Sequence, residues 1–323
     1  MDKNKNKFPR LKLKNPILIV AWPGMGDVAY KVALNLIEKL KMEEFFVLNP
    51  ESFFYPTGVT IKNDLLDLTE LPYSKFFVYK NKAGSNDLVV FISNAQPDLV
   101  FANNYCDALL DFIIQLKIKI IFSFAAMPLP IDHLTKPNVW AAVTDKELID
   151  IFGKYNVKFM KEGHVSGMNG LFLGMAKKRG IKGVCLLGEI PLYAVQLENP
   201  RAAIAILEIL MSMLSINISL KDLEMQAQEI QGQIEQLIDF LKGGGSAPPP
   251  IGDEEIEHLK YTLGQYTNLP QSVKLRIEQL FEEAKKDLKN ATILKQELDK
   301  WGIYKEYEDR FLDLFKKQKP RGN

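Results

Sequence analysis

Short apolar runs alternate with amphipathic segments through about the first two-thirds of the chain. The short runs are apolar at consecutive positions, which is typical of strands that are buried on both faces. The amphipathic segments repeat apolar residues every three or four positions, as helices with one buried face do. This alternation predicts an α/β fold in which a largely parallel sheet is covered on both sides by helices.

The apolar runs and amphipathic segments can be assigned to residues. Strands are predicted at residues 17–21, 45–48, 76–79, 88–93, 118–124, 139–143 and 183–187. Helices are predicted at residues 27–40, 105–116, 167–178 and 200–214. Thr144 and Glu147 form a capping-box pattern that opens a further short helix. Residues 50–72 match neither pattern, so the topology of that segment stays open.

A different pattern follows Leu214, where apolar residues recur at alternating steps of three and four and Gln and Glu lie between them. Two apolar positions per heptad are typical of a coiled-coil seam, and β-branched residues at both positions favour a trimer over a dimer. The alternative is a helix that packs against its own chain. The predicted seam consists of Leu220, Leu223, Ala227, Ile230, Ile234, Leu237 and Leu241.

The clearest break in the chain is GGGSAPPP, from Gly243 to Pro250. Glycine gives flexibility and consecutive prolines give extension, so this segment is predicted to be a linker. Further helical patterns follow at residues 254–264, 270–300 and 304–317. We therefore predict an α/β domain at 1–219, a heptad helix at 220–242, a linker at 243–252 and a helical region at 253–323.

Composition excludes several classes of function. Hydrophobic residues make up 47% of the 323, which is enough for a buried core. Because 41 Lys and Arg balance 40 Asp and Glu, neither nucleic acid nor an anionic membrane is expected as the main partner. Cys106 and Cys185 lie in apolar stretches without CxxC spacing and are expected to be free, buried thiols. With no signal peptide or membrane-spanning run, a cytoplasmic protein is expected.

The turn after the first predicted strand is the first candidate for chemistry. Gly24, Gly26 and Ala29 satisfy the GxGxxG/A pattern of dinucleotide-binding turns. However, Pro23 removes a backbone donor and Asp27 places a negative charge where a phosphate would lie. No acid stands about 20 residues further on, where one would bind a ribose. We therefore expect a structural turn, with one or both glycines at positive φ and Asp27 as the helix N-cap.

Other candidate groups are few. The three histidines have no metal-ligand spacing, and no P-loop, kinase or zincin motif is present, so no metal or cofactor is expected. Glu189 follows a central strand and is either a pocket acid or a tether for a turn. Asn94 and Gln96 follow another predicted strand and would share a strand-end pocket with Glu189. These residues do not establish a reaction.

Four segments, taken in order, resemble the PAC2 family, and they lie within about the first 220 residues. The first has a Pro-Gly-x-Gly turn and the second is a strand that ends in a Gln-Pro turn. The third and fourth are apolar helices with their flanking strand and loops. The segments are Ile17 to Leu40, Asp87 to Pro97, Gly167 to Tyr193 and Asn199 to Leu223.

The resemblance implies a three-layer α/β/α core similar to that of purine nucleoside phosphorylases. It also implies self-assembly or pairing with a paralogue and, for the best-understood members, chaperoning of proteasome rings without catalysis. Such chaperones dock through a C-terminal hydrophobic-Tyr-any tripeptide, whereas this sequence ends in KPRGN. Ile303-Tyr304-Lys305 has the pattern at an internal position. Docking through the familiar tail is therefore not expected here.

Two hypotheses for function follow. The first is a non-catalytic scaffold or assembly chaperone that forms a homo-oligomer, with a trimer favoured, and that has a protein client such as a proteasome subunit. The second is a nucleoside- or nucleotide-binding protein, or an enzyme, that uses a strand-end pocket of the core. The first hypothesis accounts for the lack of assembled catalytic residues and for the heptad helix. A screen of nucleosides by thermal shift separates the two hypotheses.

Overall fold

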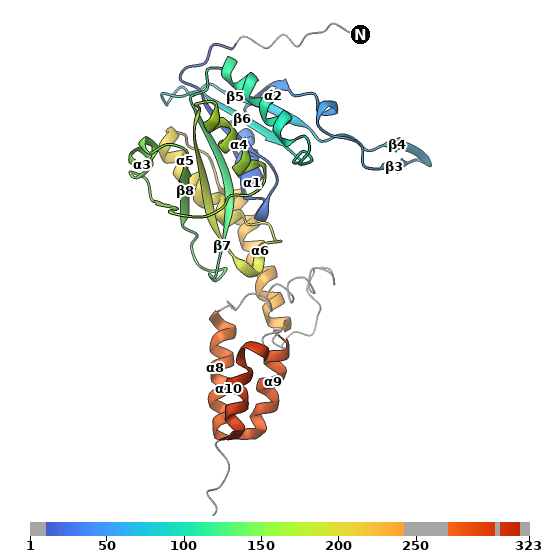
Figure 1. The fold of residues 1–323 in the computed structure, drawn as a ribbon, viewed down its shortest axis with the longest axis vertical. Coiled ribbons are helices and arrows are strands. Elements are labelled where there is room, and N and C mark those ends of the chain that lie inside the picture. The colour runs from blue at the N-terminus through green and yellow to red at the C-terminus, as the bar shows by residue number, and fades with distance from the viewer. Residues whose placement is uncertain (1–10, 242–270, 301–303, 317–323) are drawn as a thin grey trace, which may run out of the picture. The chain divides into compact units, whose positions relative to one another are not determined.

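A computed structural model describes residues 11–241, 271–300 and 304–316 (Figure 1). Its larger sheet has eight strands in the order β2-β5-β6-β1-β7-β10-β8-β9. The strands are β1 (Ile17–Ala21), β2 (Glu43–Val47), β5 (Ser74–Tyr79), β6 (Leu88–Ser93), β7 (Ile120–Leu129), β8 (Val139–Val143), β9 (Val157–Phe159) and β10 (Lys182–Pro191). A separate two-stranded sheet pairs β3 (Val59–Lys62) with β4 (Leu65–Leu68).

The sheet is parallel at its centre and has antiparallel pairs towards both edges. β1 pairs in parallel with both neighbours, and Ile17 lies beside Leu88 of β6 and Ile120 of β7. β5 is antiparallel to both β6 and β2, and β8 is antiparallel to β10 but parallel to β9. All five residues of β1 and all six of β6 are buried, as expected for strands with helices on both faces.

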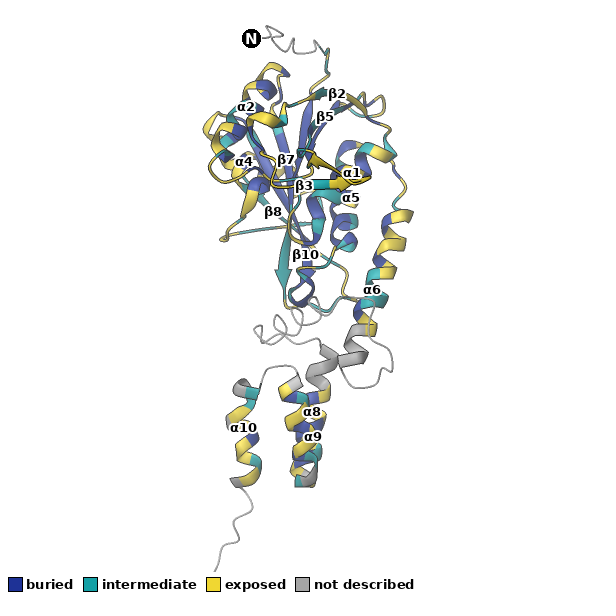
Figure 2. Cartoon of the chain, turned by 90° about the vertical axis from the view of Figure 1, so that its right-hand side faces the viewer, coloured by how far each residue is buried: buried dark blue, intermediate teal, exposed yellow. Residues whose placement is uncertain are grey.

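Helices cover both faces of this sheet, which confirms the predicted α/β architecture. Figure 2 shows α2 and α4 on one side of the sheet and α1 and α5 on the other. The helices of this part are α1 (Val28–Lys39), α2 (Ala102–Gln115), α3 (Glu147–Phe152), α4 (Gly167–Lys178) and α5 (Pro200–Leu214). The specific likeness to purine nucleoside phosphorylases stays an expectation from the resemblance.

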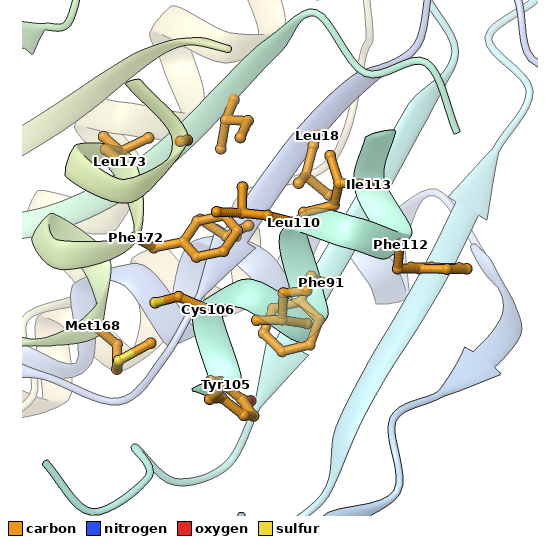
Figure 3. Close-up of a cluster of buried hydrophobic side chains, with 14 of the residues drawn as sticks. Leu18, Phe91, Tyr105, Cys106, Leu110, Phe112, Ile113, Met168, Phe172 and Leu173 are labelled. Atoms are coloured by element: carbon orange, nitrogen blue, oxygen red, sulfur yellow. The ribbon is translucent and has the colours of Figure 1, made fainter. Parts of the chain in front are cut away.

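One large apolar cluster fills the space between the sheet and the helices α2 and α4 (Figure 3). Phe91 of β6, Leu110 of α2 and Phe172 of α4 are fully buried in it. Cys106 belongs to the same cluster, and both cysteines are free and buried, as predicted. Burial raises the pKa of each thiol to about 12, so both stay protonated and unreactive at neutral pH.

The chain divides into two compact units. The first contains residues 1–127, 137–189 and 198–225, and the second contains residues 128–136, 190–197 and 226–323. This division differs from the predicted domains because short segments at the ends of β7 and β10 group with the C-terminal helices. The predicted linker at 243–252 and the predicted helix at 254–264 lie outside the described residues. The domain boundaries of the sequence analysis therefore stay a prediction.

The second unit has an apolar cluster of its own. Its helices are α8 (Gln271–Lys286), α9 (Ala291–Lys300) and α10 (Tyr304–Lys316), together with the end of α6 (Lys221–Leu241). The single helical pattern predicted at 270–300 is thus two helices, with a turn between them. The buried residues of the cluster are Tyr193, Ala194, Ile234, Ile277, Leu280, Phe281, Ala284, Ala291, Leu294, Leu298 and Phe311. Among the described residues, no helix has the length and apolar character needed to cross a bilayer.

Candidate functional site

The turn between β1 and α1 is built around two consecutive residues with left-handed backbone. Gly26 has φ +65°, and Asp27 has φ +48°. Gly24 has φ −168°, an extended conformation that other residues also adopt. The prediction of at least one glycine at positive φ is confirmed by Gly26. Asp27 occupies the N-cap position of α1, but its side chain makes no capping hydrogen bond, so the expected carboxylate cap is wrong.

Asn199 closes this turn from the start of α5. Its backbone N–H donates to the Gly26 carbonyl at 2.8 Å, and its side-chain oxygen accepts from the Ala202 N–H at 3.1 Å. A Cβ atom at Gly26 would lie 3.2 Å from the Cβ atom of Asn199. Gly26 is therefore required both for its backbone conformation and for the close approach of α5.

Two side-chain amides tie the same turn to the start of α4. The Gln96 amide donates to the Pro23 carbonyl at 2.7 Å and accepts from the Met168 N–H at 3.0 Å. The buried amide of Asn169 accepts from the Trp22 N–H at 3.2 Å and donates to the Trp22 carbonyl at 3.1 Å. The carboxyl ends of β1 and β6 are thus joined to α4 by the side-chain amides of Gln96 and Asn169.

A buried chain of polar groups lies behind the turn. The Trp22 indole donates to the Tyr105 hydroxyl at 3.4 Å, and this hydroxyl lies 2.6 Å from the Ser74 hydroxyl. Ser74 in turn donates to Ser93 at 3.2 Å, and Ser93 donates to the Ala95 carbonyl at 2.8 Å. Burial raises the pKa of Tyr105. Its neutral phenol is therefore the form that connects helix α2 to the strand ends.

Asn94 holds the neighbouring loop. Its side-chain oxygen accepts from the Tyr73 N–H at 2.7 Å, and its backbone N–H donates to the Tyr73 carbonyl at 3.3 Å. The Tyr73 hydroxyl lies 2.5 Å from that of Tyr30 on α1. Burial and this hydrogen bond raise the pKa of Tyr30. Asn94 therefore positions a tyrosine pair beside the turn.

Glu189 lies elsewhere in the first unit, near the end of β10. Its carboxylate accepts from the backbone N–H and the amide of Asn138, at 2.9 and 2.7 Å, and from the Trp140 indole at 2.8 Å. Lys158 approaches to 3.8 Å and lies over the Trp140 ring. The structure brings Gly24, Gly26, Asn94 and Gln96 to the ends of β1 and β6, and it places Glu189 in a separate network.

A surface hollow of about 440 Å³ lies at the end of β8 and β9. The loop that follows β9 and the start of α3 form its walls, and its charged groups are Asp145, Lys146, Lys161, Glu162 and Lys177. None of the five predicted ligand-binding residues lines it. Among the described residues, no group of three or more His, Cys, Asp or Glu is arranged to hold a metal ion.

The predicted seam lies on α6, apart from Leu220, which directly precedes this helix, and the single chain already covers part of it. Leu223, Ala227 and Ile234 are buried, and Ile230 and Ile234 pack in the apolar cluster of the C-terminal helices. This arrangement corresponds to the alternative in which the helix packs against its own chain. Leu220 is half-buried, and the side chains of Leu237 and Leu241 lie outside the described residues.

The sequence analysis missed residues that contact the turn in space but lie far from it along the chain. Asn169 is 147 positions from Trp22, and Tyr105 is 83 positions from it. A signal for Asn169 was present, because it is a polar residue between apolar neighbours in the first turn of a predicted helix. A buried polar side chain at such a position requires a partner.

Comparison with known proteins identifies this arrangement of strands, turn and helices. The model of the PAC2 family matches residues 18–238, which include β1 after its first residue, the turn, α4 and most of α6. The chain belongs to the PAC2 family. The C-terminal helices α8–α10 lie beyond the residues that match the family.

Individual relatives cover the same part of this PAC2 protein. An uncharacterised protein of Methanocaldococcus jannaschii, MJ1210, is 26% identical over 253 residues, which are 76% of this chain and 93% of the relative. The crystal structure of Pyrococcus furiosus PbaB, an archaeal proteasome activator, matches with a TM-score of 0.61 and 26% identity over 71% of this chain and 96% of PbaB. P. furiosus PbaA, a homologue of proteasome-assembly chaperones, matches with a TM-score of 0.55 and 24% identity over 69% of this chain and 92% of PbaA.

Proposed function

We propose that this protein is a non-catalytic, oligomeric scaffold that binds proteasome subunits or the assembled proteasome. The observation that carries the proposal is the match to nearly the whole of PbaB, a proteasome activator, at 26% identity. PbaA adds support for the fold alone. The scaffold acts either as an activator of the finished particle or as a chaperone of its assembly.

The geometry of the strand ends supports a scaffold over an enzyme. A dinucleotide-binding turn offers free backbone N–H groups to a pyrophosphate. Here the Trp22 N–H donates to Asn169 and the Asp27 N–H donates to the Gly24 carbonyl. The side chain of Gln96 joins Pro23 to Met168 across the same turn. These polar groups are used to join the turn after β1 to α4. Such internal hydrogen bonds make the region rigid, which suits a scaffold that binds other proteins.

Association with the proteasome is the direct test. The full-length chain is mixed with the proteasome core particle of the same organism and, separately, with its unassembled α subunits, and complexes are detected by native mass spectrometry. Binding to the core particle with faster peptide hydrolysis identifies an activator. Binding to α subunits with faster ring formation identifies a chaperone. If neither mixture gives a complex at micromolar concentration, the proposal is overturned.

The nucleoside-binding alternative has its own readout. Thermal unfolding is followed with a panel of nucleosides and nucleotides, because a ligand that binds only the folded state raises the melting temperature. We expect no saturable increase. A saturable increase that Glu189→Gln abolishes, in a variant that remains folded, would favour the alternative.

A further inference from the structure

The surface hollow at the ends of β8 and β9 lies where one strand extends beyond its neighbour. The register pairs Ala141 with Phe159, the last residue of β9, whereas β8 continues to Val143. The Ala141 carbonyl accepts from the Met160 N–H at 3.0 Å, so the backbone polar groups of Ala141 face β9. Backbone groups two residues apart on a strand point the same way, so those of Val143 also face this side, where β9 has ended. Among the described residues the Val143 N–H has no hydrogen-bond partner, and Val143 lines the hollow.

The inside of the hollow is largely apolar and has a defined shape. Its apolar lining comes from β8, β9, α3 and the loop after β9, and it consists mainly of Val143, Ile149, Phe159, Met160 and Val165. A Cβ atom at Gly170 of α4 would overlap the Val165 carbonyl oxygen, so this wall packs tightly on the helix. The volume of about 440 Å³ is within the range of small-molecule sites, roughly 300–1,000 Å³. The hollow is therefore large enough for a small organic molecule and does not have to form first.

Cationic side chains reach the hollow from three separate segments. One precedes α3, one follows β9 and one lies on α4, and they are Lys146, Lys161 and Lys177. Within the part of the chain that the structure describes, none of the three forms an ion pair. Cations nearby differ in this respect, because Lys182 binds Glu147 and Arg179 binds both Asp107 and Asp111. The ammonium groups of the hollow are therefore available to an anion.

Two acids, Asp145 and Glu162, also line the hollow. The Asp145 carboxylate accepts from the Glu147 N–H at 2.9 Å at the start of α3, and it interacts with the charge of Lys182. Glu162 is exposed in the loop after β9. Because one carboxylate is already bound and the other is exposed, the three lysines give the hollow an excess of positive charge.

We propose that this hollow binds a small organic carboxylate. The apolar part of the ligand lies against the inner lining, and its carboxylate lies among the three lysines with the Val143 N–H as a further donor. A nucleotide fits less well, because the polar groups of its sugar and base would lie unpaired against an apolar lining. The proposal goes beyond the proposed function, and its failure would leave the result of the proteasome-binding test unchanged.

Benzoate is a suitable probe, because benzamide has the same shape without the charge and acetate has the charge without the apolar ring. Titration calorimetry and saturation-transfer NMR of the full-length chain measure binding. A molecule of this size should bind with a Kd of about 0.1–1 mM. Benzamide, acetate and adenosine monophosphate should each bind at least about tenfold more weakly. Equal binding of benzoate and any of these three, or no saturable binding of benzoate up to about 10 mM, would overturn the proposal.

Charge variants locate the carboxylate of the probe. Lys146→Gln with Lys161→Gln should weaken benzoate binding about five- to tenfold. The control, Lys154→Gln with Lys178→Gln, removes the same charge from exposed lysines that do not line the hollow, and it should leave the affinity unchanged. Glu162→Gln should strengthen binding about twofold, a gain that a damaged fold does not produce. Equal affinities in the two double variants would place the anion elsewhere and contradict the proposal.

A matched pair on α3 tests the apolar lining. Ile149 lines the hollow and is 42% exposed, whereas Ile151 is 48% exposed and does not line it. Ile149→Gln should weaken benzoate binding about threefold, because it removes apolar contact area, and Ile151→Gln should have no effect. If the two variants bind benzoate equally, the ring of the probe does not lie in the hollow.

Lysine reactivity gives a second measurement that needs no variant. The wild-type chain is reductively methylated with formaldehyde for a short time, and peptide mass spectrometry gives the rate at each lysine. Saturating benzoate should slow the reaction of Lys146 and Lys161 and leave Lys154 and Lys178 unchanged, and benzamide should slow none of them. The same rates with and without benzoate at Lys146 and Lys161 would show that the carboxylate does not lie among the lysines of the hollow.

Discussion

Asn169 and Trp22 form a complete pair of hydrogen bonds between a helix and a strand end. The Asn169 side chain accepts from the Trp22 N–H at 3.2 Å and donates to the Trp22 carbonyl at 3.1 Å. Asn169 is 5% exposed, and Trp22 is fully buried. The backbone N–H and carbonyl of Trp22 lie in the turn after β1, where no neighbouring strand pairs with them. The single amide of Asn169 supplies a hydrogen bond to each.

Replacement of Asn169 by Ala should destabilise the protein markedly. The change leaves the N–H and the carbonyl of Trp22 buried without partners, which costs about 2–4 kcal/mol in the free energy of unfolding. Urea unfolding measures the difference. The control is Asn104→Ala, which changes an exposed asparagine on α2 and should alter stability by less than about 0.5 kcal/mol. A change at Asn169 no larger than that of the control would show that the pair contributes little.

The requirement for glycine at position 26 has two possible causes, its positive φ and the close approach of Asn199. Three glycine-to-alanine variants at different positions separate these two effects. Gly26 combines positive φ with the close Asn199 contact, Gly180 has φ +74° with open space around it, and Gly174 is helical with open space around it. Positive φ costs alanine about 1–2 kcal/mol, and a helical glycine costs about 0.5–1 kcal/mol relative to alanine.

We therefore expect Gly174→Ala to stabilise the protein, Gly180→Ala to destabilise it moderately and Gly26→Ala to destabilise it most. Thermal unfolding gives the order of the three. If Gly26→Ala and Gly180→Ala cost the same, the approach of Asn199 adds nothing to the requirement for glycine at position 26.

The sequence predicts those parts of the fold in which burial controls the pattern. The bounds of β1, β6, β8, α4 and α5 agree with the predicted ranges, because each is either a continuous apolar run or an amphipathic helix against the core. The β3–β4 hairpin was not predicted. Its large apolar side chains are exposed in the single chain. An apolar pattern normally marks residues that pack in the core, and this rule fails for the hairpin.

The candidate site was predictable only in part. The positive φ of Gly26 follows from local turn chemistry. The roles of Gln96 and Asn169 depend on partners 73 and 147 positions away, which no local pattern contains. For Glu189 the sequence favoured a tether over a pocket acid, because carboxylates at strand ends often serve turns, but both roles place a carboxylate there. Only the three-dimensional positions of Asn138 and Trp140, which donate hydrogen bonds to Glu189, distinguish the two roles.

Acid should weaken the network of Glu189. Burial favours the neutral acid, but hydrogen bonds from Asn138 and Trp140 and the charge of Lys158 hold the pKa of Glu189 below its ordinary value of 4.5. Because the folded pKa is the lower one, the carboxylate contributes stability above pH 4.5. That contribution is lost as the pH falls through the folded pKa.

The variant Glu189→Gln removes this dependence. At pH 7 it should reduce the free energy of unfolding by about 1.5–3 kcal/mol, since the lost hydrogen bonds have a charged acceptor. The deficit relative to the wild type should shrink as the pH falls below 4.5. Urea unfolding at pH 7 and pH 3.5 measures it, with the exposed Glu70→Gln as control. A deficit that is constant with pH would show that Glu189 acts through packing alone.

The role of the predicted seam on α6 can be decided at Ile230 and Ile234. Ile234 is 6% exposed in the single chain, and both residues pack in the cluster that includes Phe281 and Leu294. Glutamine at both positions would bury two polar amides beside apolar side chains, which is unfavourable without partners. We expect the double variant to unfold or loosen the C-terminal helical cluster, with a loss of about 2–5 kcal/mol for that part.

Hydrogen exchange of α8–α10 measures the loosening, and light scattering of the same sample measures the mass. The matched control is Met225→Gln, which changes a residue of α6 that is 68% exposed. It should leave both readouts unchanged. If the double variant becomes monomeric while α8–α10 keep their protection, these isoleucines contact another copy and the seam is intermolecular. Faster exchange in α8–α10 at unchanged mass would establish the seam as a contact within the chain, because the two isoleucines then stabilise their own cluster and not the oligomer.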